Sequence, residues 1–312
     1  MKLRTIFKEN TILRVVYLLV FIFIITNEAI YSPDTRSYLN ALPYRHPGYV
    51  LFLKSFKFIF SSFFDLSILI FQGAFGLLAV NFFFKKATQI FNLSTICKVI
   101  LMVLLIFLFF NQLYVANNIF PEGFCYLLYL LFIATILDFI KNDSYKKLLL
   151  AFIFYVLLAL TRGQFIFTPL IFAFVYFLEK QSQLLKISKI FKLILLISMP
   201  VVVVLAEATY HKLKDGIFMT TPFGFVNAST AAFFVSSEND SQHITSYDDK
   251  IVFEKSYQKL KIEKLLMSSQ DSLNSYAQYY NFFHNNVPPI CNRTIHELGK
   301  KHYFDKALIT TN

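Results

Sequence analysis

Residues 66–84 read Leu-Ser-Ile-Leu-Ile-Phe-Gln-Gly-Ala-Phe-Gly-Leu-Leu-Ala-Val-Asn-Phe-Phe-Phe, and Lys85 and Lys86 follow directly. The stretch has no charged side chain. A helix needs about 20 mostly apolar residues to cross the hydrocarbon core of a bilayer. The stretch therefore predicts a transmembrane helix that ends at the two lysines, since basic side chains favour the membrane surface.

The composition of the whole chain agrees with a membrane protein. Hydrophobic residues make up 56 % of the 312 residues and charged residues only 16 %, whereas a soluble domain has about 25 % charged residues. This balance excludes a disordered chain, a coiled coil and an ordinary cytosolic enzyme. The three cysteines are too few for a disulfide framework or a zinc site.

Other apolar stretches lie on both sides of residues 66–84. Residues 49–64 are apolar but carry Lys54 and Lys57, which is typical of a helix that lies at the membrane interface. The remaining stretches predict further spans, so we expect an all-α polytopic protein with about seven transmembrane helices. These stretches are 11–30 (which we read as uncleaved), 96–110, 123–140, 148–160, 165–178 and 190–208.

The distribution of lysine and arginine predicts how the helices are oriented. With the N-terminus in the cytoplasm, most basic residues between the spans fall on the cytoplasmic side, as the positive-inside rule requires. The net charge of +11 therefore reflects topology. Because no basic stripe carries interleaved stacking aromatics, we expect no nucleic-acid partner. We expect a multi-pass protein of the cytoplasmic (inner) membrane.

The composition changes at residue 209, where polar residues begin to dominate. We therefore expect a membrane module over 1–208 and an incomplete soluble segment over 209–312 on the non-cytoplasmic side. Residues 254–266 and 272–283 have helical patterns, whereas Val287-Pro288-Pro289 predicts a break. The segment is predicted to be of mixed structure.

The first outer loop, residues 31–48, is dense in polar side chains. Ionisable groups near membrane depth are costly and mark functional sites more often than elsewhere. Asp34 follows a proline and can begin a helix that carries Tyr38 on the same face one turn later. Arg45 and His46 precede a Pro-Gly turn. In the alternative interpretation, Asp34 is only a helix cap and Arg45 only contacts a lipid head group.

Two more ionisable residues are predicted on the same side of the membrane. Glu122 follows a proline at the start of residues 123–140, where an acid also favours the positive end of the helix dipole. Arg162 lies between two spans and can either contact a lipid phosphate at the surface or bind a phosphate bidentately in a cavity. Their common side with Asp34 favours one shared site.

Taken in order, these motifs resemble the GT-C superfamily of integral-membrane glycosyltransferases. The motifs are Asp34-x-x-x-Tyr38, then Arg45-x-Pro-Gly-Tyr before an apolar helix, then Pro-Glu122, then Arg162. The chain looks most like the bacterial protein O-mannosyltransferase and lipid A aminoarabinose transferase type. The resemblance covers residues 1–208, and it implies a module of seven helices whose first outer loop carries the catalytic acid.

The resemblance implies transfer of a sugar from a polyprenyl-phosphate donor to a hydroxyl of a lipid, glycan or protein acceptor, with inversion, on the outer face of the membrane. It assigns Asp34 as general base. Arg162, Arg45 and His46 become ligands of the donor phosphate. Glu122 and Tyr38 become orienting groups for the acceptor or a metal ion. Glu122 could instead hold an arginine, and use of a divalent metal ion as cofactor stays open because relatives differ.

The chain departs from the family pattern in two respects. Thr35 follows Asp34, whereas family members often have a second acid there. Most members also continue into further spans, so we expect this chain to be C-terminally truncated or to have a reduced second half.

Two other functional classes remain open. A polymerase or ligase of surface polysaccharide also uses polyprenyl-linked donors, and it would extend a chain instead of adding one sugar. A non-enzymatic transporter or lipid-binding protein would carry paired charges or broken helices near mid-membrane. The nearly uncharged spans and the collection of polar groups on one side favour chemistry at one interface.

Overall fold

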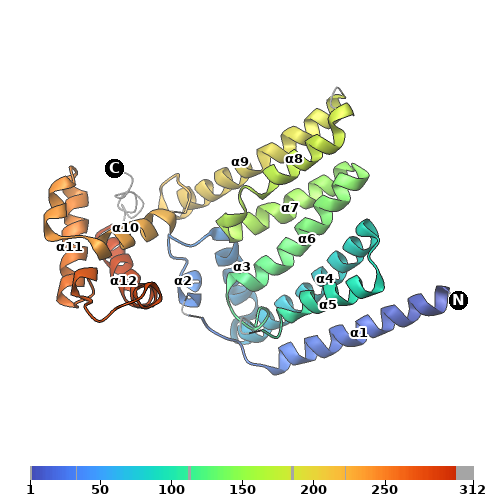
Figure 1. Ribbon diagram of the computed structural model, residues 1–312, viewed down its shortest axis with the longest axis horizontal. Helices are drawn as coiled ribbons and strands as arrows, with labels where there is room; N and C mark the ends of the chain where they lie inside the picture. The colour runs from blue at the N-terminus through green and yellow to red at the C-terminus, as the bar shows by residue number, and fades with distance from the viewer. Residues whose placement is uncertain (1, 33, 112–113, 184–185, 222, 300–312) are drawn as a thin grey trace. The chain divides into compact units, whose positions relative to one another are not determined.

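The computed structural model describes residues 2–32, 34–111, 114–183, 186–221 and 223–299. These residues are about 80 % helical and form no strand, which confirms an all-α fold for the described part. The helices are α1 (Lys2–Thr26), α2 (Thr35–Leu39), α3 (Pro47–Phe60), α4 (Phe64–Phe91), α5 (Thr95–Phe107), α6 (Pro121–Asn142), α7 (Tyr145–Thr161), α8 (Thr168–Lys180), α9 (Ile187–Asp215), α10 (Phe223–Val235), α11 (Tyr247–Ile262) and α12 (Tyr276–Gly299) (Figure 1).

The chain forms two compact units. The first comprises Met1–Leu42 and His46–Ala206, and the second comprises Pro43–Arg45 and Glu207–Asn312. Helices α1 to α8 and most of α9 therefore belong to the first unit. Helices α10 to α12 belong to the second.

Every stretch predicted as a span overlaps a helix of the first unit. Among the described residues, four helical segments are long and apolar enough to cross a membrane by length and composition. The full set of seven spans and the orientation stay predictions. The four segments are Pro47–Phe91 (α3 and α4), Pro121–Asn142 (α6), Gly163–Lys180 (α8 with the turn before it) and Ile187–Asp215 (α9).

Helix α6 lies at the centre of the first unit, between α4 and α7 (Figure 1). Its Phe132 is fully buried, together with Ile68 of α4 and Leu148 of α7. Other large apolar side chains, such as Leu104 of α5 and Ile171 of α8, are exposed. Soluble monomers rarely expose such apolar faces over several helices, so this distribution fits contact with lipid.

The region from residue 49 to 84 divides into two helices, as its lysines suggested. Helix α3 ends at Phe60, and α4 begins at Phe64 after a short turn in which Ser61 has φ of 43°. Helix α3 contacts α2, α4 and α7 and lies at one end of the helical layer (Figure 1). Its exposed Phe58 and Ile59 suit a position at the membrane interface.

The second unit corrects two expectations for the C-terminal segment. Its described residues form helices and turns without a strand, so this part is helical and not mixed. Pro288 and Pro289 lie inside α12 and do not break it. The reason is tertiary packing: Val287, Cys291 and Ile295 of this helix are fully buried in a core with α10 and α11. That burial offsets the lost helical hydrogen bonds.

Candidate functional site

Backbone pairing joins the first loop to the segment that leads into α6. The amide of Ile30 donates to the carbonyl of Asn117 at 2.9 Å, and the amide of Ile119 donates to the carbonyl of Ile30 at 2.9 Å. The hydroxyl of Thr35 donates to the carbonyl of Ile119 at 2.8 Å. Asp34 precedes Thr35, and Glu122 follows Ile119 by three residues. These bonds therefore bring the two acidic segments to the same end of the helical unit.

Buried amide side chains hold this end in place. Asn117 is fully buried and donates to the carbonyl of Ile24 at 2.8 Å, where α1 ends. Gln72 of α4 is nearly fully buried and donates to the carbonyl of Ala116 at 2.9 Å. Gly123 is required beside them, because a Cβ there would lie 2.2 Å from the carbonyl oxygen of Val115. The loop before α6 is thus fixed from three sides.

Arg162 forms an ion pair with Glu122 at this end. Glu122 lies in the first turn of α6, and Arg162 is the extended residue that ends α7. The guanidinium carbon of Arg162 lies 5.3 Å from the centre of the Phe120 ring, a cation–π distance. The side chains of Arg162 and Glu122 are 27 % and 34 % exposed. The pair is therefore partly sheltered and still reachable from outside.

One carboxylate oxygen of Glu122 does not take part in the ion pair. The pair with Arg162 uses Oε1, whereas Oε2 is buried and has no hydrogen-bond partner among the described residues. Buried polar atoms are normally satisfied, and an exception points to a function or to a bound group. Among the buried oxygens at this end that have no hydrogen-bond partner in the described residues, which include Oε1 of Gln72 and Oδ1 of Asn117, this one alone belongs to an acid.

His46 packs against the residue after Arg162. A Cβ on Gly163 would lie 2.7 Å from Cε1 and 2.9 Å from Nε2 of His46, so only glycine leaves room for the ring. Gly48, two residues after His46, is needed for a similar reason, since its Cβ would lie 2.6 Å from the hydroxyl oxygen of Thr161. The start of α3 therefore contacts the end of α7. We call His46, Glu122, Arg162 and Gly163 the Arg162 cluster.

Asp34 and Tyr38 take different environments. Helix α2 begins at Thr35 as predicted, but the Asp34 side chain makes no capping hydrogen bond to it. Its backbone carbonyl instead accepts from the hydroxyl of Ser37 at 2.6 Å. Tyr38 is only 2 % exposed and packs edge-on against Tyr49, with ring centres 5.4 Å apart. Tyr38 thus lies in the apolar core of the first unit.

Arg45 is the predicted site residue that falls in the second unit. Its guanidinium carbon lies 5.2 Å from the centre of the Tyr44 ring, and the residue is buried. The Arg162 cluster, by contrast, belongs entirely to the first unit. The candidate site in the first unit therefore comprises Asp34, His46, Glu122 and Arg162. Arg45 is not part of it.

A tyrosine that the sequence did not single out ties the loop to α4. The hydroxyl of Tyr31 donates to Oδ1 of Asp65 at 2.5 Å. Burial, and then this hydrogen bond to a carboxylate, raise the pKa of Tyr31 to about 12. The phenol therefore stays protonated and the contact stays intact at neutral pH.

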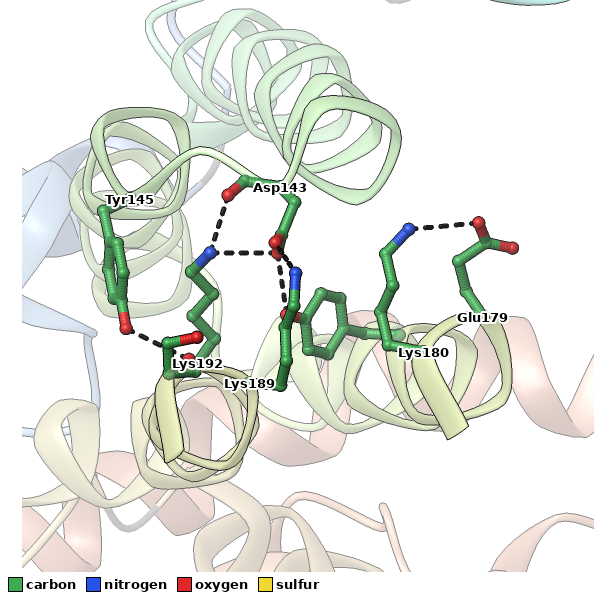
Figure 2. A network of polar contacts seen from close by, with 8 residues as sticks. Asp143, Tyr145, Glu179, Lys180, Lys189 and Lys192 are labelled. Carbon is green, nitrogen blue, oxygen red and sulfur yellow. Dashed lines mark hydrogen bonds and ion pairs between the residues drawn. The ribbon is translucent and has the colours of Figure 1, made fainter. Parts of the chain in front are cut away.

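A second polar cluster lies at the opposite ends of the same helices. Asp143, at the corner after α6, accepts from Lys189, from Lys192 at 3.0 Å and from the hydroxyl of Tyr176 at 2.8 Å (Figure 2). Asp138 accepts in the same way from two lysines, at 2.8 and 3.1 Å, and from Asn142. We call this the Asp143 cluster; its charged members are Lys86, Asp138, Asp143, Lys147, Lys189 and Lys192.

Sequence reasoning missed most of the supporting residues. Gln72 had a signal, because a lone amide within an apolar span needs buried partners. Gly163 had no such signal, because the need for glycine there comes from the His46 ring, which is distant in the sequence and packs against it only in the fold. The described residues contain no group of three or more His, Cys, Asp or Glu side chains placed to hold a metal ion.

Comparison of the chain with protein-family models, with curated proteins and with solved structures finds no match. The functional argument consequently depends on the residues themselves.

Proposed function

We propose that the chain is a membrane glycosyltransferase that moves a sugar from a polyprenyl phosphate to an acceptor hydroxyl on the outer face of the cytoplasmic membrane. The observation that carries the proposal is the pairing of Arg162 with Glu122 at the end of the helical unit that also holds the Asp34 loop. The order of the motifs along the chain supports the same function.

Arg162 is suited to hold the donor phosphate. A guanidinium has five N–H donors in a rigid fork, and the ion pair with one carboxylate oxygen leaves donors for a second anion. Glu122 would act as a positioning residue that fixes the direction of this fork. Because the Arg162 side chain is partly exposed, a lipid-linked phosphate can reach it from outside the protein.

The proposed reaction assigns one step to each group. As the acceptor oxygen attacks the anomeric carbon, Asp34 takes its proton as general base. The bond between the anomeric carbon and the phosphate oxygen breaks, and polyprenyl phosphate leaves with the electron pair from the opposite face, so the centre inverts. The positive charge of Arg162, with His46 beside it, stabilises the negative charge that develops on the phosphate.

The test uses vesicles that contain the full chain and undecaprenyl phosphate carrying radiolabelled glucose, mannose or aminoarabinose. We expect at least one donor to release undecaprenyl phosphate only when the chain is present. Glu122→Gln should lower that rate about tenfold, because Arg162 loses a charge-assisted hydrogen bond that holds it.

Glu179→Gln is the matched control, since Glu179 lies on α8 and its side chain is 57 % exposed. Its rate should equal that of the wild type. Failure of all three donors to turn over would count against the proposal, and a ladder of extended products would favour a polysaccharide polymerase instead.

A further inference from the structure

An elongated groove lies between α1, α4 and α5, away from the Arg162 cluster. Its volume is about 760 Å3. Most of its wall is apolar, with Val16 from α1, Phe84 from α4 and Val103 from α5. The groove is part of the first unit alone.

The polar residues of the groove gather at the corner between α4 and α5. Lys85, Thr88 and Gln89 lie in the last turns of α4, and Thr95 and Lys98 lie in the first turns of α5. The positive end of the α5 dipole adds to the charge of the two lysines. The groove therefore has an apolar length and one cationic end.

Two observations show that the protein itself does not satisfy this end. No ion pair of the described residues includes Lys85 or Lys98, although the neighbouring Lys86 pairs with Asp138 at 2.8 Å. The hydroxyl oxygen of Thr88 is buried and has no hydrogen-bond partner among the described residues. A buried hydroxyl without a partner is costly. An anion with oxygen acceptors would satisfy all three groups.

The dimensions of the groove fit one leaflet of a bilayer. From Lys98 to Phe107, α5 rises about 14 Å at 1.5 Å per residue. Half of the hydrocarbon core of a bilayer is about 15 Å. A lipid whose phosphate rests at Lys98 would thus carry its acyl chain along the apolar wall as far as Phe107.

We propose that this groove binds an anionic phospholipid, with its phosphate at Lys85 and Lys98 and one acyl chain between α1, α4 and α5. Basic pockets between transmembrane helices are known to select anionic lipid head groups. The apolar wall can bury an acyl chain but makes no hydrogen bond or ion pair with a water-soluble anion. The groove therefore favours a lipid over a free phosphate. The inference is independent of glycosyl transfer.

The test is native mass spectrometry of the detergent-solubilised full chain, mixed with equal amounts of dioleoyl phosphatidylglycerol or dioleoyl phosphatidylcholine. We expect the wild type to retain phosphatidylglycerol preferentially. Lys85→Gln with Lys98→Gln should lower this retention about 25-fold, since each lysine near an anionic head group contributes roughly fivefold. Lys54→Gln with Lys57→Gln removes the same charge from exposed positions on α3 and should leave retention unchanged.

A second variant tests the apolar wall separately. Val103 is 60 % exposed on α5, so Val103→Trp can fold while its ring fills the groove. Retention of both lipids should then fall although the lysines are intact. Equal retention by the wild type and the double lysine variant, or complete displacement of the lipid by glycerol phosphate, would overturn the proposal.

Discussion

The two polar clusters of the first unit lie at opposite ends of the same helices and differ in how completely they are paired. In the Asp143 cluster, each acid faces two lysines and at least one further donor. In the Arg162 cluster, one acid faces one arginine, and Oε2 of Glu122 has no partner among the described residues. Each acid at one end has two cationic partners, whereas the acid at the other end has one.

This difference separates a structural role from a functional one. The lysines of α9 reach Asp143 at the corner between α6 and α7, so the Asp143 cluster fastens helices that are distant in sequence (Figure 2). A clamp of this kind needs its acids fully paired, because an unpaired carboxylate away from water is costly. A ligand site instead needs polar groups that are held in position and still have donors or acceptors available for a ligand. The comparison therefore favours a stabilising role for the Asp143 cluster and supports the proposed chemistry at the Arg162 cluster.

Asp34→Asn should have the largest effect on transfer. The substitution keeps the size of the side chain and removes the base, so transfer of labelled sugar should fall about 10²–10⁴-fold. Because asparagine keeps a side-chain oxygen acceptor and the same size, the thermal midpoint should change little. A transfer rate near that of the wild type would remove the general-base role and leave the two ends without a chemical difference.

Asp143→Asn should affect stability and not chemistry. Asparagine tolerates the left-handed backbone of this position, where φ is 53°, so the substitution isolates the charge. Two lysines whose side chains are 12 % and 5 % exposed would lose their counter-charge, which should cost about 3 kcal/mol of folding free energy. The measurement is the thermal midpoint in detergent, together with transfer per folded molecule. A stable variant that fails in transfer would contradict the division of roles.

Gly163→Ala should have an intermediate effect through His46. The added methyl group would lie 2.7 Å from the imidazole ring, and overpacking of this kind costs about 1–3 kcal/mol. The double variant Gly163→Ala with His46→Ala should regain most of the loss, because the clash is removed. Thermal midpoints of the two single variants and the double variant measure this coupling. Additive losses would show that His46 does not pack against Gly163.

Tyr31→Phe should have the smallest effect, and it is recognised by how stability changes with alkaline pH. The folded chain holds the Tyr31 proton with a pKa of about 12, against an ordinary value of 10. The contact with Asp65 therefore adds stability below pH 10 that is lost as the pH rises from 10 to 12. Over this interval the thermal midpoint of the wild type should fall more steeply than that of Tyr31→Phe. Parallel curves would mean that the contact contributes nothing.

The sequence predicted the helices well, because the length and apolarity of a span are local properties. Residues 66–84 fall within α4, and the lysines of residues 49–64 indicated a separate helix before it. The break at Pro288-Pro289 was wrong for a non-local reason. It depended on local propensity, whereas α12 is held by Val287, Cys291 and Ile295 packed in the core of the second unit.

The candidate site was predictable only in part. Membrane topology put Glu122 and Arg162 on one side, but their direct pairing depends on how closely α6 and α7 pack, which no spacing encodes. The contact of His46 with Gly163 depends on the same packing. The burial of Tyr38 was not predictable in the same way, since a helical face shared with Asp34 did not reveal that its ring packs in the core.

The most direct test is equilibrium binding of radiolabelled undecaprenyl-phosphate sugar to the detergent-solubilised chain and to its Arg162→Ala and Arg162→Lys variants. Two charge-assisted hydrogen bonds from the guanidinium fork are worth about 3 kcal/mol, so we expect Arg162→Ala to weaken donor binding about 100-fold. Lysine should restore only part of the affinity, because it keeps the charge without the fork. Donor affinity that is the same in all three proteins would contradict a phosphate-binding role for the Arg162 cluster.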